Sequence, residues 1–398
     1  MEINMERLLE TVLENAHKVG NVVVVGAGRR GRELLFHLNK EKSICVLCIF
    51  DNAIEEDKIG EVSVSHPYKI KGKECIYIIA IDSLKVQKEV TNQLKNLGIS
   101  EKDILYFYNV RNYDYISSLD EKDYRNEIQA MYYEHFSRKI NWQNPSTYTE
   151  IINWEKVNVR DKRRTELADK YLARKWVGDK IGDEHLTKIY GVWDNANEIK
   201  FDELPNAFVL KLNNGSGYNI IVKNKLDIDQ TEVRKKLNKW KDRNYAYCSL
   251  ELHYKDIVPK IICEEYLEGL AENIYDYNIY CFHGEPVYIW CIKGSHKPDC
   301  KASFYDKNWN MQPFSFGYPK DPILAPRPVK LNEMLEFSRI LSQDFNHVRV
   351  DWYNMPDGRL LFGEMTFSSW SGLSHFEPEE YDNYFGNLIN ESIEVSKI

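Results

Sequence analysis

The sequence has 398 residues, of which 43% are hydrophobic and 29% are charged, and its formal net charge is −8 at pH 7. This length suffices for two or three domains, and the acidic balance argues against a duplex nucleic-acid binder, which needs a basic surface. The first 18 residues lack the basic start and long apolar stretch of a signal peptide, and no apolar run reaches the ~20 residues of a membrane span, so we expect a cytoplasmic protein.

Strands alternate with helices in the first third of the chain. Residues 1–20 show apolar positions at helical spacing, and "NVVVVGAGRRGRELLFHLNKE" from residue 21 predicts a strand, a glycine-rich turn and a helix. Further strands are predicted at 44–52, 75–81 and 103–108, with a second long helix at 83–98. This alternation predicts a small parallel α/β domain over residues 1–108.

The remainder of the chain divides into a connector and a larger domain. Residues 109–160 are polar and helix-prone and are predicted to be a helical connector. Residues 161–186 are predicted to form one helix that ends near Gly182. Beyond them β-type runs dominate, with interposed helices, and we expect an α+β domain over residues 161–398.

The stretch "RVDWYNMPDGRLLFGEMTF", residues 349–367, predicts a β-hairpin because an Asp-Gly turn signal separates two β-type runs. A two-residue loop would place Asp351 opposite Glu364 and Arg349 opposite Thr366. The alternation of side chains along a strand puts all four residues on one face.

Two carboxylates that oppose each other on a hairpin repel, unless a cation lies between them. Mg²⁺ prefers such oxygen ligands, with phosphate oxygens completing its shell, and Arg349 beside them could hold a phosphate. The alternative is a solvent-exposed face, with Val350 and Trp352 forming the only buried side. A bulge near the turn, which Pro356 flanks, would shift the pairing by one residue.

The stretch "LKLNNGSGYNIIV", residues 210–222, joins two apolar runs through a loop of small polar residues. Gly215, Ser216 and Gly217 offer unhindered backbone N–H groups that can surround phosphates. Lys211 just upstream would supply a positive charge, although a strand lysine is commonly only an outward-facing residue.

These features occur in a recognisable order. Lys211 with its loop, the "CEEYLEG" strand end at 263–269 and the Arg-x-Asp…Glu-x-Thr hairpin follow one another as in an ATP-grasp domain. From about residue 133 to 398 the chain resembles the TupA-like branch of that superfamily, named for a teichuronopeptide-biosynthesis protein. The resemblance is carried by "NPSTYTE", "LADKYLARKWV", "LPNAFVLKLNNGSGYNIIV", "DYNIYCFHGEPVYI" and "VRVDWYNMPDGRLLFGEMTF".

The resemblance implies a nucleotide site. It implies that ATP lies between two α+β lobes under the glycine loop, with Lys170 and Lys211 at its phosphates. The adenine-binding hinge would comprise Glu264, Tyr266 and Leu267. Glu272 would reach the ribose.

The resemblance also implies a metal site and a reaction. Asp351 and Glu364 would bind Mg²⁺, with Glu364 bridging two ions, and Arg349 would steady the transferred phosphoryl group. Thr366 stands where the wider superfamily has Asn, a difference that affects the second ion. The implied enzyme is a carboxylate–amine ligase that forms an amide through an acyl phosphate and releases ADP. Its carboxylate would be a sugar acid such as glucuronate, in the assembly of a capsule or another surface polysaccharide.

The N-terminal "VVVVGAGRRGRELL" fits the G-x-G-x-x-G pattern through Gly26, Gly28 and Gly31. Asp51 ends the next predicted strand, where a ribose-binding acid is expected. The domain resembles small Rossmann-like nucleotide-binding domains that hold nucleotide sugars. Three interpretations stay open: a nucleotide-sugar site, a degenerate structural or dimerising domain, and an NAD(H) site.

Two functional alternatives to the ligase remain. One is a glycosyltransferase or nucleotide-sugar-modifying enzyme that acts through the N-terminal domain. The other is a non-catalytic module that senses a nucleotide. The first would turn over without ATP, and the second would bind ATP without forming ADP.

Overall fold

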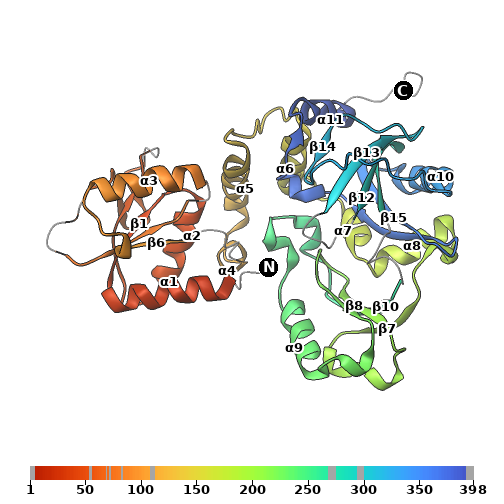
Figure 1. Ribbon diagram of the computed structural model, residues 1–398, viewed down its shortest axis with the longest axis horizontal. Helices are drawn as coiled ribbons and strands as arrows, with labels where there is room; N and C mark the ends of the chain where they lie inside the picture. Colours follow the sequence, from red (N-terminus) through yellow and green to blue (C-terminus); the bar gives the residue numbers. More distant parts are fainter. Residues whose placement is uncertain are drawn as a thin grey trace. The chain divides into compact units, whose positions relative to one another are not determined.

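The computed structural model describes residues 5–52, 56–68, 70, 73–81, 84–107, 113–267, 275–293 and 300–390. The chain divides into two compact units, residues 1–139 and residues 140–398 (Figure 1). The division falls inside the segment 109–160 that was expected to be a connector. Helix α6 (Tyr148–Asn158) therefore belongs to the second unit.

The first unit contains a sheet with strand order β3-β4-β2-β1-β5-β6 (Figure 1). Strands β4, β2, β1, β5 and β6 run parallel, and β3 pairs antiparallel with β4 at one edge. The strands are β1 (Asn21–Val25), β2 (Cys45–Phe50), β3 (Lys58–Ile59), β4 (Val62–Ser65), β5 (Ile76–Ile79) and β6 (Ile104–Tyr106). The helices are α1 (Met5–Val19), α2 (Arg29–Leu38), α3 (Leu84–Asn96), η1 (Glu101–Asp103), α4 (Tyr113–Ser117) and α5 (Glu121–Phe136). The predicted parallel α/β domain is confirmed, and the edge strands β3 and β4 were not predicted.

Strand β1 lies at the centre of this sheet and is buried on both faces. Val22 and Val24 pack with residues of α1 and α2, whereas Val23 and Val25 pack on the opposite face with Leu94 of α3. A strand covered on both faces reads as a continuous apolar run, which explains the unbroken valines of "NVVVV".

The first sheet of the second unit is antiparallel and has the strand order β7-β10-β8-β9. Its strands are β7 (Ile189–Trp193), β8 (Phe208–Leu212), β9 (Asn219–Val222) and β10 (Ile261–Glu265). Helix α9 (Gln230–Lys241) covers one face, and its Val233 and Leu237 join the core of β8 and β10. Short 3₁₀ turns connect these elements: η2 (Asp183–His185), η3 (Ala196–Glu198), η4 (Phe201–Glu203), η5 (Lys225–Asp227), η6 (Tyr245–Cys248) and η7 (Leu252–Tyr254).

A second antiparallel sheet has the order β13-β12-β11-β15-β16. Its strands are β11 (Tyr275–Phe282), β12 (Glu285–Lys293), β13 (Lys301–Asp306), β15 (His347–Asn354) and β16 (Leu360–Thr366). The remaining elements of the unit are α7 (Lys162–Ala168), α8 (Leu172–Ile181), α10 (Leu331–Ser342), α11 (Glu380–Asn390), η8 (Ser369–Gly372) and the small pair β14 (Ser315–Phe316) with β17 (Phe376–Glu377).

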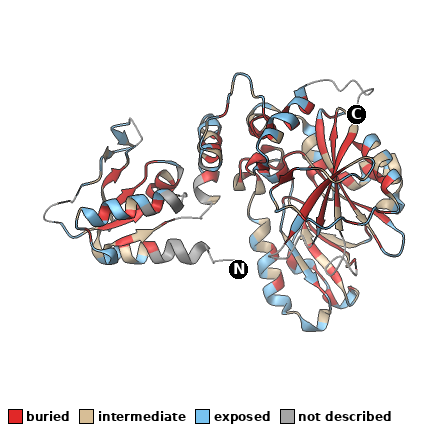
Figure 2. Cartoon of the chain, turned by 45° about the horizontal axis from the view of Figure 1, so that its top comes forward, coloured by how far each residue is buried: buried red, intermediate tan, exposed pale blue. Residues whose placement is uncertain are grey.

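The two faces of this second sheet have different coverings. Val350 and Trp352 of β15 are fully buried in a core that α8 and α10 complete. The opposite face carries Tyr280 and Trp290, which pack in an aromatic cluster with α6 and α11. Figure 2 shows buried residues concentrated along these strands. Arg349 and Asp351 alternate along β15 with Val350 and Trp352 of the first core and therefore lie on the second face.

The single helix predicted for residues 161–186 is wrong, because the chain breaks between α7 and α8. One carboxylate oxygen of Asp169 accepts hydrogen bonds from the N–H groups of Tyr171 and Leu172, which starts α8 anew. The other oxygen accepts from Asn213, whose carbonyl oxygen in turn accepts the Lys170 N–H. The predicted stop at Gly182 is confirmed, since Gly182 caps α8 with φ 103°.

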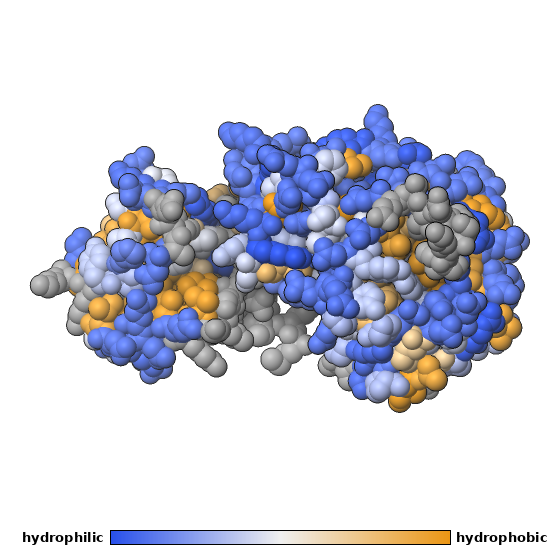
Figure 3. Space-filling view, turned by 90° about the horizontal axis from the view of Figure 1, so that it is seen from above, coloured by the Kyte–Doolittle hydropathy of each residue, from blue (hydrophilic) through white to orange (hydrophobic). Residues whose placement is uncertain are grey.

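Hydrophilic side chains predominate on the face shown in Figure 3, and the hydrophobic ones form small separate patches. Within the described ranges, every helix is too short or too polar to span a lipid bilayer.

Candidate active site

The hairpin β15–β16 has a different loop from the one predicted. Met355 N–H donates to the carbonyl oxygen of Arg359 at 2.8 Å, which leaves a three-residue loop rather than two. Gly358 ends this loop with φ 87°, a left-handed conformation that suits glycine. The loop shifts the pairing by one residue, so that Trp352 pairs with Phe362.

A β-bulge then shifts the pairing back. The register changes between Val350 and Trp352, so that Asp351 faces both Gly363 and Glu364. The predicted direct opposition of Asp351 and Glu364 is therefore wrong in detail. The extra loop residue and the extra bulge residue cancel, and the predicted pair of Arg349 with Thr366 is confirmed.

Arg349 is the centre of the polar cluster on this hairpin. Its guanidinium binds both oxygens of Asp351, at 2.7 and 2.6 Å, in a bidentate ion pair. The same group donates to Thr366 Oγ1 at 3.1 Å and to Ser369 Oγ at 3.2 Å, and lies 3.5 Å from Glu364 Oε1. Asp351 is only 8% exposed, so the alternative of a solvent-exposed hairpin face does not describe the structure.

Lys170 joins this cluster from the break between α7 and α8. Its Nζ lies 3.0 Å from Glu364 Oε2 and donates to the Gly215 carbonyl oxygen at 2.7 Å. Lys170, the glycine loop and the hairpin, which are far apart in the sequence, therefore meet at one ammonium group.

The two carboxylates of the cluster have opposite pKa shifts. Burial raises the pKa of Asp351 to about 6, although Arg349 acts against it. Burial alone would also raise the pKa of Glu364, but the charges of Lys170 and Arg349 outweigh it and lower the pKa to about 2. Glu364 is thus held as a carboxylate.

The donor set of this hairpin fits Mg²⁺. Asp351 supplies buried and Glu364 partly exposed carboxylate oxygens, and Thr366 supplies a hydroxyl, the hard ligands that Mg²⁺ binds. Nowhere in the described part of the chain do three or more His, Cys, Asp or Glu side chains form a group that could hold a metal.

The glycine loop lies between β8 and β9. Gly215 has φ 81° and Gly217 φ 78°, so both glycines are needed for their backbone conformation. At Gly215 a Cβ atom would lie 2.3 Å from the Tyr245 ring, whereas at Gly217 it would meet nothing within 4 Å. One end of the loop is thus packed against the protein and the other is open.

Lys211 and Glu264 form a second ionic cluster on the neighbouring strands β8 and β10. Lys211 Nζ lies 2.5 Å from Glu264 Oε2, and Arg174 of α8 lies 3.8 Å from the other oxygen. The Lys211 side chain is 21% exposed, so it is not simply an outward-facing lysine.

The residues that follow Glu264 at the end of β10 differ in how far they are buried. Leu267 is buried against Met355 and Leu361 of the hairpin, and Tyr266 is half-buried. Glu272 lies outside the described residues.

Polar residues of β11 were missed by the sequence analysis. Asn278 is 5% exposed and pairs directly with Asp351, and Tyr280 pairs with Arg349. The sequence feature that could have identified them is the alternation of polar residues in "DYNIY", within a strand that is otherwise apolar. Ser369, which contacts Arg349, carried no such signal.

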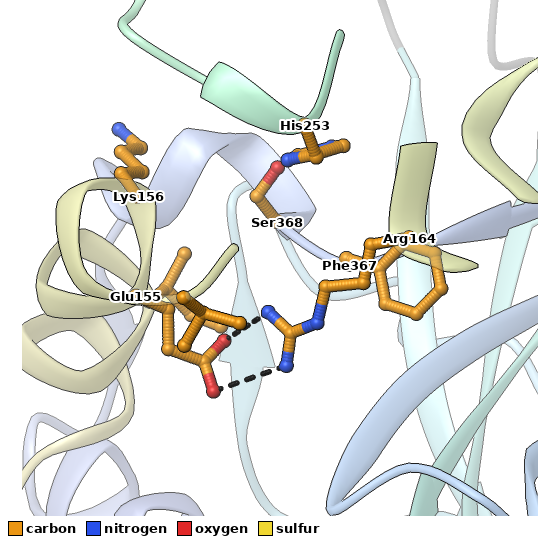
Figure 4. A pocket seen from close by; sticks show the side chains of 8 residues that line it. Glu155, Lys156, Arg164, His253, Phe367 and Ser368 are labelled. Carbon is orange, nitrogen blue, oxygen red and sulfur yellow. Dashed lines mark hydrogen bonds and ion pairs between the residues drawn. The ribbon is translucent and has the colours of Figure 1, made fainter. Parts of the chain in front are cut away.

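A further buried polar cluster lies at the end of the hairpin, where Phe367 and Ser368 follow Thr366. Arg164 of α7 binds both oxygens of Glu155 of α6, at 2.7 and 3.2 Å (Figure 4). His347 Nε2 lies 2.8 Å from the same carboxylate. These contacts bind α6 and α7 to β15 and so support the position of Lys170.

A small pocket adjoins this cluster, and His253 lies at its wall (Figure 4). The buried Nε2 of His253 has no hydrogen-bond partner. Burial, with the nearby charges of Arg164 and Lys156, lowers the pKa of His253 to about 3. The pocket is lined by Ile152, Glu155, Lys156, Val159, Arg164, His253, Phe367 and Ser368.

Gly26 and Gly28 of the first unit follow the carboxyl end of β1, and Gly31 lies in the first turn of α2. Ala27 N–H donates to Asp51 at 2.7 Å, so the glycine turn and Asp51 are brought together. A Cβ at Gly31 would lie 1.8 Å from the Gly26 carbonyl oxygen, whereas Gly28 has open space. Gly31 therefore serves close helix–strand packing.

A family model described as TupA-like ATPgrasp matches residues 150–390. Because this match covers more than half of the chain, the protein belongs to the TupA-like ATP-grasp family. The resemblance drawn from the sequence motifs is thus confirmed, and so is the fold class, an α/β unit followed by an ATP-grasp domain.

Among curated proteins no match was found. Similar solved structures include N5-carboxyaminoimidazole synthase from Aspergillus clavatus (11% identity, 88% of this chain and 70% of that chain, TM-score 0.31). Others are an L-amino acid ligase from Bacillus licheniformis (12%, 95% and 77%, 0.35) and D-alanine–D-alanine ligase from Bacillus anthracis (13%, 87% and 85%, 0.32).

Proposed function

We propose that residues 140–398 form an ATP- and Mg²⁺-dependent carboxylate–amine ligase that releases ADP. The observation that carries this proposal is the meeting of Lys170, the glycine loop and the paired carboxylates of the hairpin at one place. Phosphoryl transfer depends on positioning and on neutralising charge, and this cluster contains groups for both.

Each side chain of the cluster has a role in the proposal. Asp351 and Glu364, with Thr366, would hold Mg²⁺, which neutralises the phosphates when bound. The same two carboxylates pair with Arg349 and Lys170, so both cationic side chains lie beside the proposed metal site, where they would contact phosphate oxygens.

The nucleotide would lie beside the sheet β7-β10-β8-β9, which carries Lys211 and Glu264. Lys211 would contact the phosphates, and Glu264 would keep its ammonium in place. Gly215, Ser216 and Gly217 would cover the phosphates with backbone N–H groups. Tyr266 and Leu267, with Glu264, would hold the adenine, and Glu272 would reach the ribose.

The reaction has two steps. An oxygen of the substrate carboxylate attacks the γ-phosphorus of ATP, the bond to the β-phosphate oxygen breaks, and ADP leaves. The amine nitrogen of the second substrate then attacks the acyl carbon, loses a proton and expels inorganic phosphate. Arg349 steadies the transferred phosphoryl group, and the chain need not supply a nucleophile.

We further propose that the carboxylate belongs to a sugar acid, such as glucuronate, and that the reaction takes place in the cytoplasm during assembly of a surface polysaccharide. The support is the sequence resemblance to a branch named for teichuronopeptide biosynthesis. The amine would be an amino acid or a small amino alcohol.

The Glu364→Ala variant tests the metal site. It should abolish ADP formation while circular dichroism and the thermal midpoint show an intact fold. Glu379→Ala, at an exposed position in the same unit, is the matched control and should retain activity. Retained turnover in Glu364→Ala would show that the metal site is wrongly assigned.

For the first unit, we propose that the glycine turn and Asp51 hold a nucleotide or a nucleotide sugar. The supporting observation is the hydrogen bond that brings Asp51 to the turn. An enzyme that acts only through this unit would lose activity in Gly28→Ala rather than in Lys211→Ala, and would not need ATP.

A further inference from the structure

Strand β11 places three polar side chains, Asp276, Asn278 and Tyr280, on the face of the sheet that carries Arg349 and Asp351. Asn278 pairs directly with Asp351, and the register of β11 on β15 is regular along its whole length. Directly opposed side chains of an antiparallel pair project to the same side, with Cβ atoms about 5 Å apart. The amide of Asn278 is therefore a direct neighbour of one of the proposed metal ligands.

Of these three side chains, only Asn278 has no partner among the residues that the structure describes. Tyr280 forms hydrogen bonds with Ser369 and Arg349, and Asp276 also interacts with its surroundings. Asn278 is 5% exposed, yet its amide is not fully enclosed. Buried polar groups are normally hydrogen-bonded, so a ligand oxygen that reaches this amide would satisfy a buried donor.

The cationic side chains of the candidate site are directed away from β11. Arg349 and Lys170 both contact Glu364 of β16. Strands β11 and β16 pair with opposite edges of β15, so Asn278 lies on the other side of Asp351 from these contacts. A phosphoryl group held at Asp351 would thus have both cations on its β16 side and the amide of Asn278 on its β11 side.

We propose that the Nδ2 group of Asn278 donates a hydrogen bond to an oxygen of the γ-phosphoryl group of ATP. Hydrogen bonds to charged oxygens are short and strong, so this contact would help the site to distinguish ATP from ADP. A role as a further Mg²⁺ ligand is less favourable, because proteins usually bind Mg²⁺ through one or two carboxylates together with phosphate oxygens. The inference rests on the proposed ligase function and adds a nucleotide contact to its site.

The test compares two nucleotides that differ in the γ-phosphoryl group. Calorimetry measures the Kd of the full-length protein for the non-hydrolysable ATP analogue AMP-PNP and for ADP, each with Mg²⁺. Loss of one hydrogen bond to a charged oxygen should weaken AMP-PNP binding at least about tenfold and change ADP binding by less than about twofold. The result does not depend on the identity of the carboxylate or the amine, because neither is added.

Two variants remove the donor and keep the shape of the side chain. Asn278→Leu replaces the amide with an apolar group of similar size, so the thermal midpoint of the nucleotide-free protein should not fall. Asn278→Asp replaces the donor with a negative charge and should weaken AMP-PNP binding more than Asn278→Leu does. Asn308→Leu, at an exposed position after β13, is the control and should bind both nucleotides as the wild type does.

Unchanged AMP-PNP binding in the two variants, or an equal loss for AMP-PNP and ADP, would overturn the proposal. If Asn278→Leu fails to fold, Asn278→Asp decides the matter. Tighter binding of both nucleotides and of Mn²⁺, measured by electron paramagnetic resonance, in Asn278→Asp would overturn the proposal in favour of a metal ligand. A wild type that binds neither nucleotide would contradict the proposed function and this contact with it. Loss of AMP-PNP binding in the variants, without ADP formation by the wild type in any substrate mixture, would support the contact and contradict the ligase function alone.

Discussion

Lys170 Nζ lies 3.0 Å from the Glu364 carboxylate and donates to the Gly215 carbonyl oxygen at 2.7 Å, so that one ammonium group joins the hairpin to the glycine loop. This contact links the proposed metal site with the proposed phosphate site. Its removal should affect both nucleotide binding and phosphoryl transfer.

Lys170→Met should lower kcat for ADP formation by about 10²-fold and raise KM for ATP, because a cation at the developing charge is lost. Steady-state ADP release at varied ATP concentration measures both constants. Lys175→Met, an exposed lysine on α8 that pairs with Asp179, is the matched control. Equal kinetics in the two variants would exclude a phosphate-binding role for Lys170.

The two glycines of the loop provide a matched pair. Gly217→Ala should destabilise the protein by about 1–2 kcal/mol, since only the left-handed backbone is strained. Gly215→Ala should add about 1–3 kcal/mol for the clash with Tyr245. Urea denaturation measures both changes, and ATP binding should weaken more in Gly215→Ala. An equal loss of stability in the two variants would contradict the packing of Gly215 on Tyr245.

Gly31 and Gly28 of the first unit provide a second matched pair for substitution. Gly31→Ala should cost more than about 3 kcal/mol, because its Cβ would meet the Gly26 carbonyl oxygen at 1.8 Å. Gly28→Ala should cost about 1 kcal/mol, as an alanine is a poor N-cap residue. Thermal unfolding distinguishes them, and a tolerated Gly31→Ala would be inconsistent with the close approach of α2 and β1. Because Gly28→Ala keeps the fold, it is the variant with which to test nucleotide binding at this turn.

The buried His253 should make the free energy of unfolding depend on pH. Its pKa falls from 6.5 to about 3 in the folded protein, so between these values the unfolded chain binds a proton that the folded protein does not. The free energy of unfolding should therefore decrease as the pH falls below 6.5, by roughly 1–2 kcal/mol between pH 7 and pH 5.

His253→Phe should remove this part of the pH dependence. Denaturation in urea at pH 7, 6 and 5 compares the variant with the wild type. Val258→Ala, at an exposed position of the same segment, should keep the wild-type slope. An unchanged slope in His253→Phe would mean that the histidine is not buried in its neutral form.

Much of the candidate site could be predicted from local pattern. The alternation along "RVDWY" places Arg349 and Asp351 on one face of β15, and the alternation along "GEMTF" places Glu364 and Thr366 on one face of β16, because side chains alternate along every strand. The pairing of residues across the two strands could not be predicted as reliably from the sequence. It depends on a three-residue loop and on a bulge at Gly363, and the pair of Arg349 with Thr366 is correct only because these two irregularities cancel.

Helix propensity does not predict the break between α7 and α8. "TELADKYLARK" has the composition of a continuous helix, and the interruption comes from hydrogen bonds between Asp169 and Asn213, which are far apart in the sequence. The same tertiary contact brings Lys170 to the glycine loop. Local sequence identified Lys170 only through family resemblance, and the structure supplies the physical reason for its position.

The central claim is tested most directly by ADP release from the purified protein with ATP and Mg²⁺, over a grid of sugar acids and amines. Mass spectrometry of each productive mixture identifies the product. ADP release should need both substrates, and the product should be lighter than their sum by one water molecule. ADP release with no amide product in any mixture, or amide formation without ATP, would contradict it.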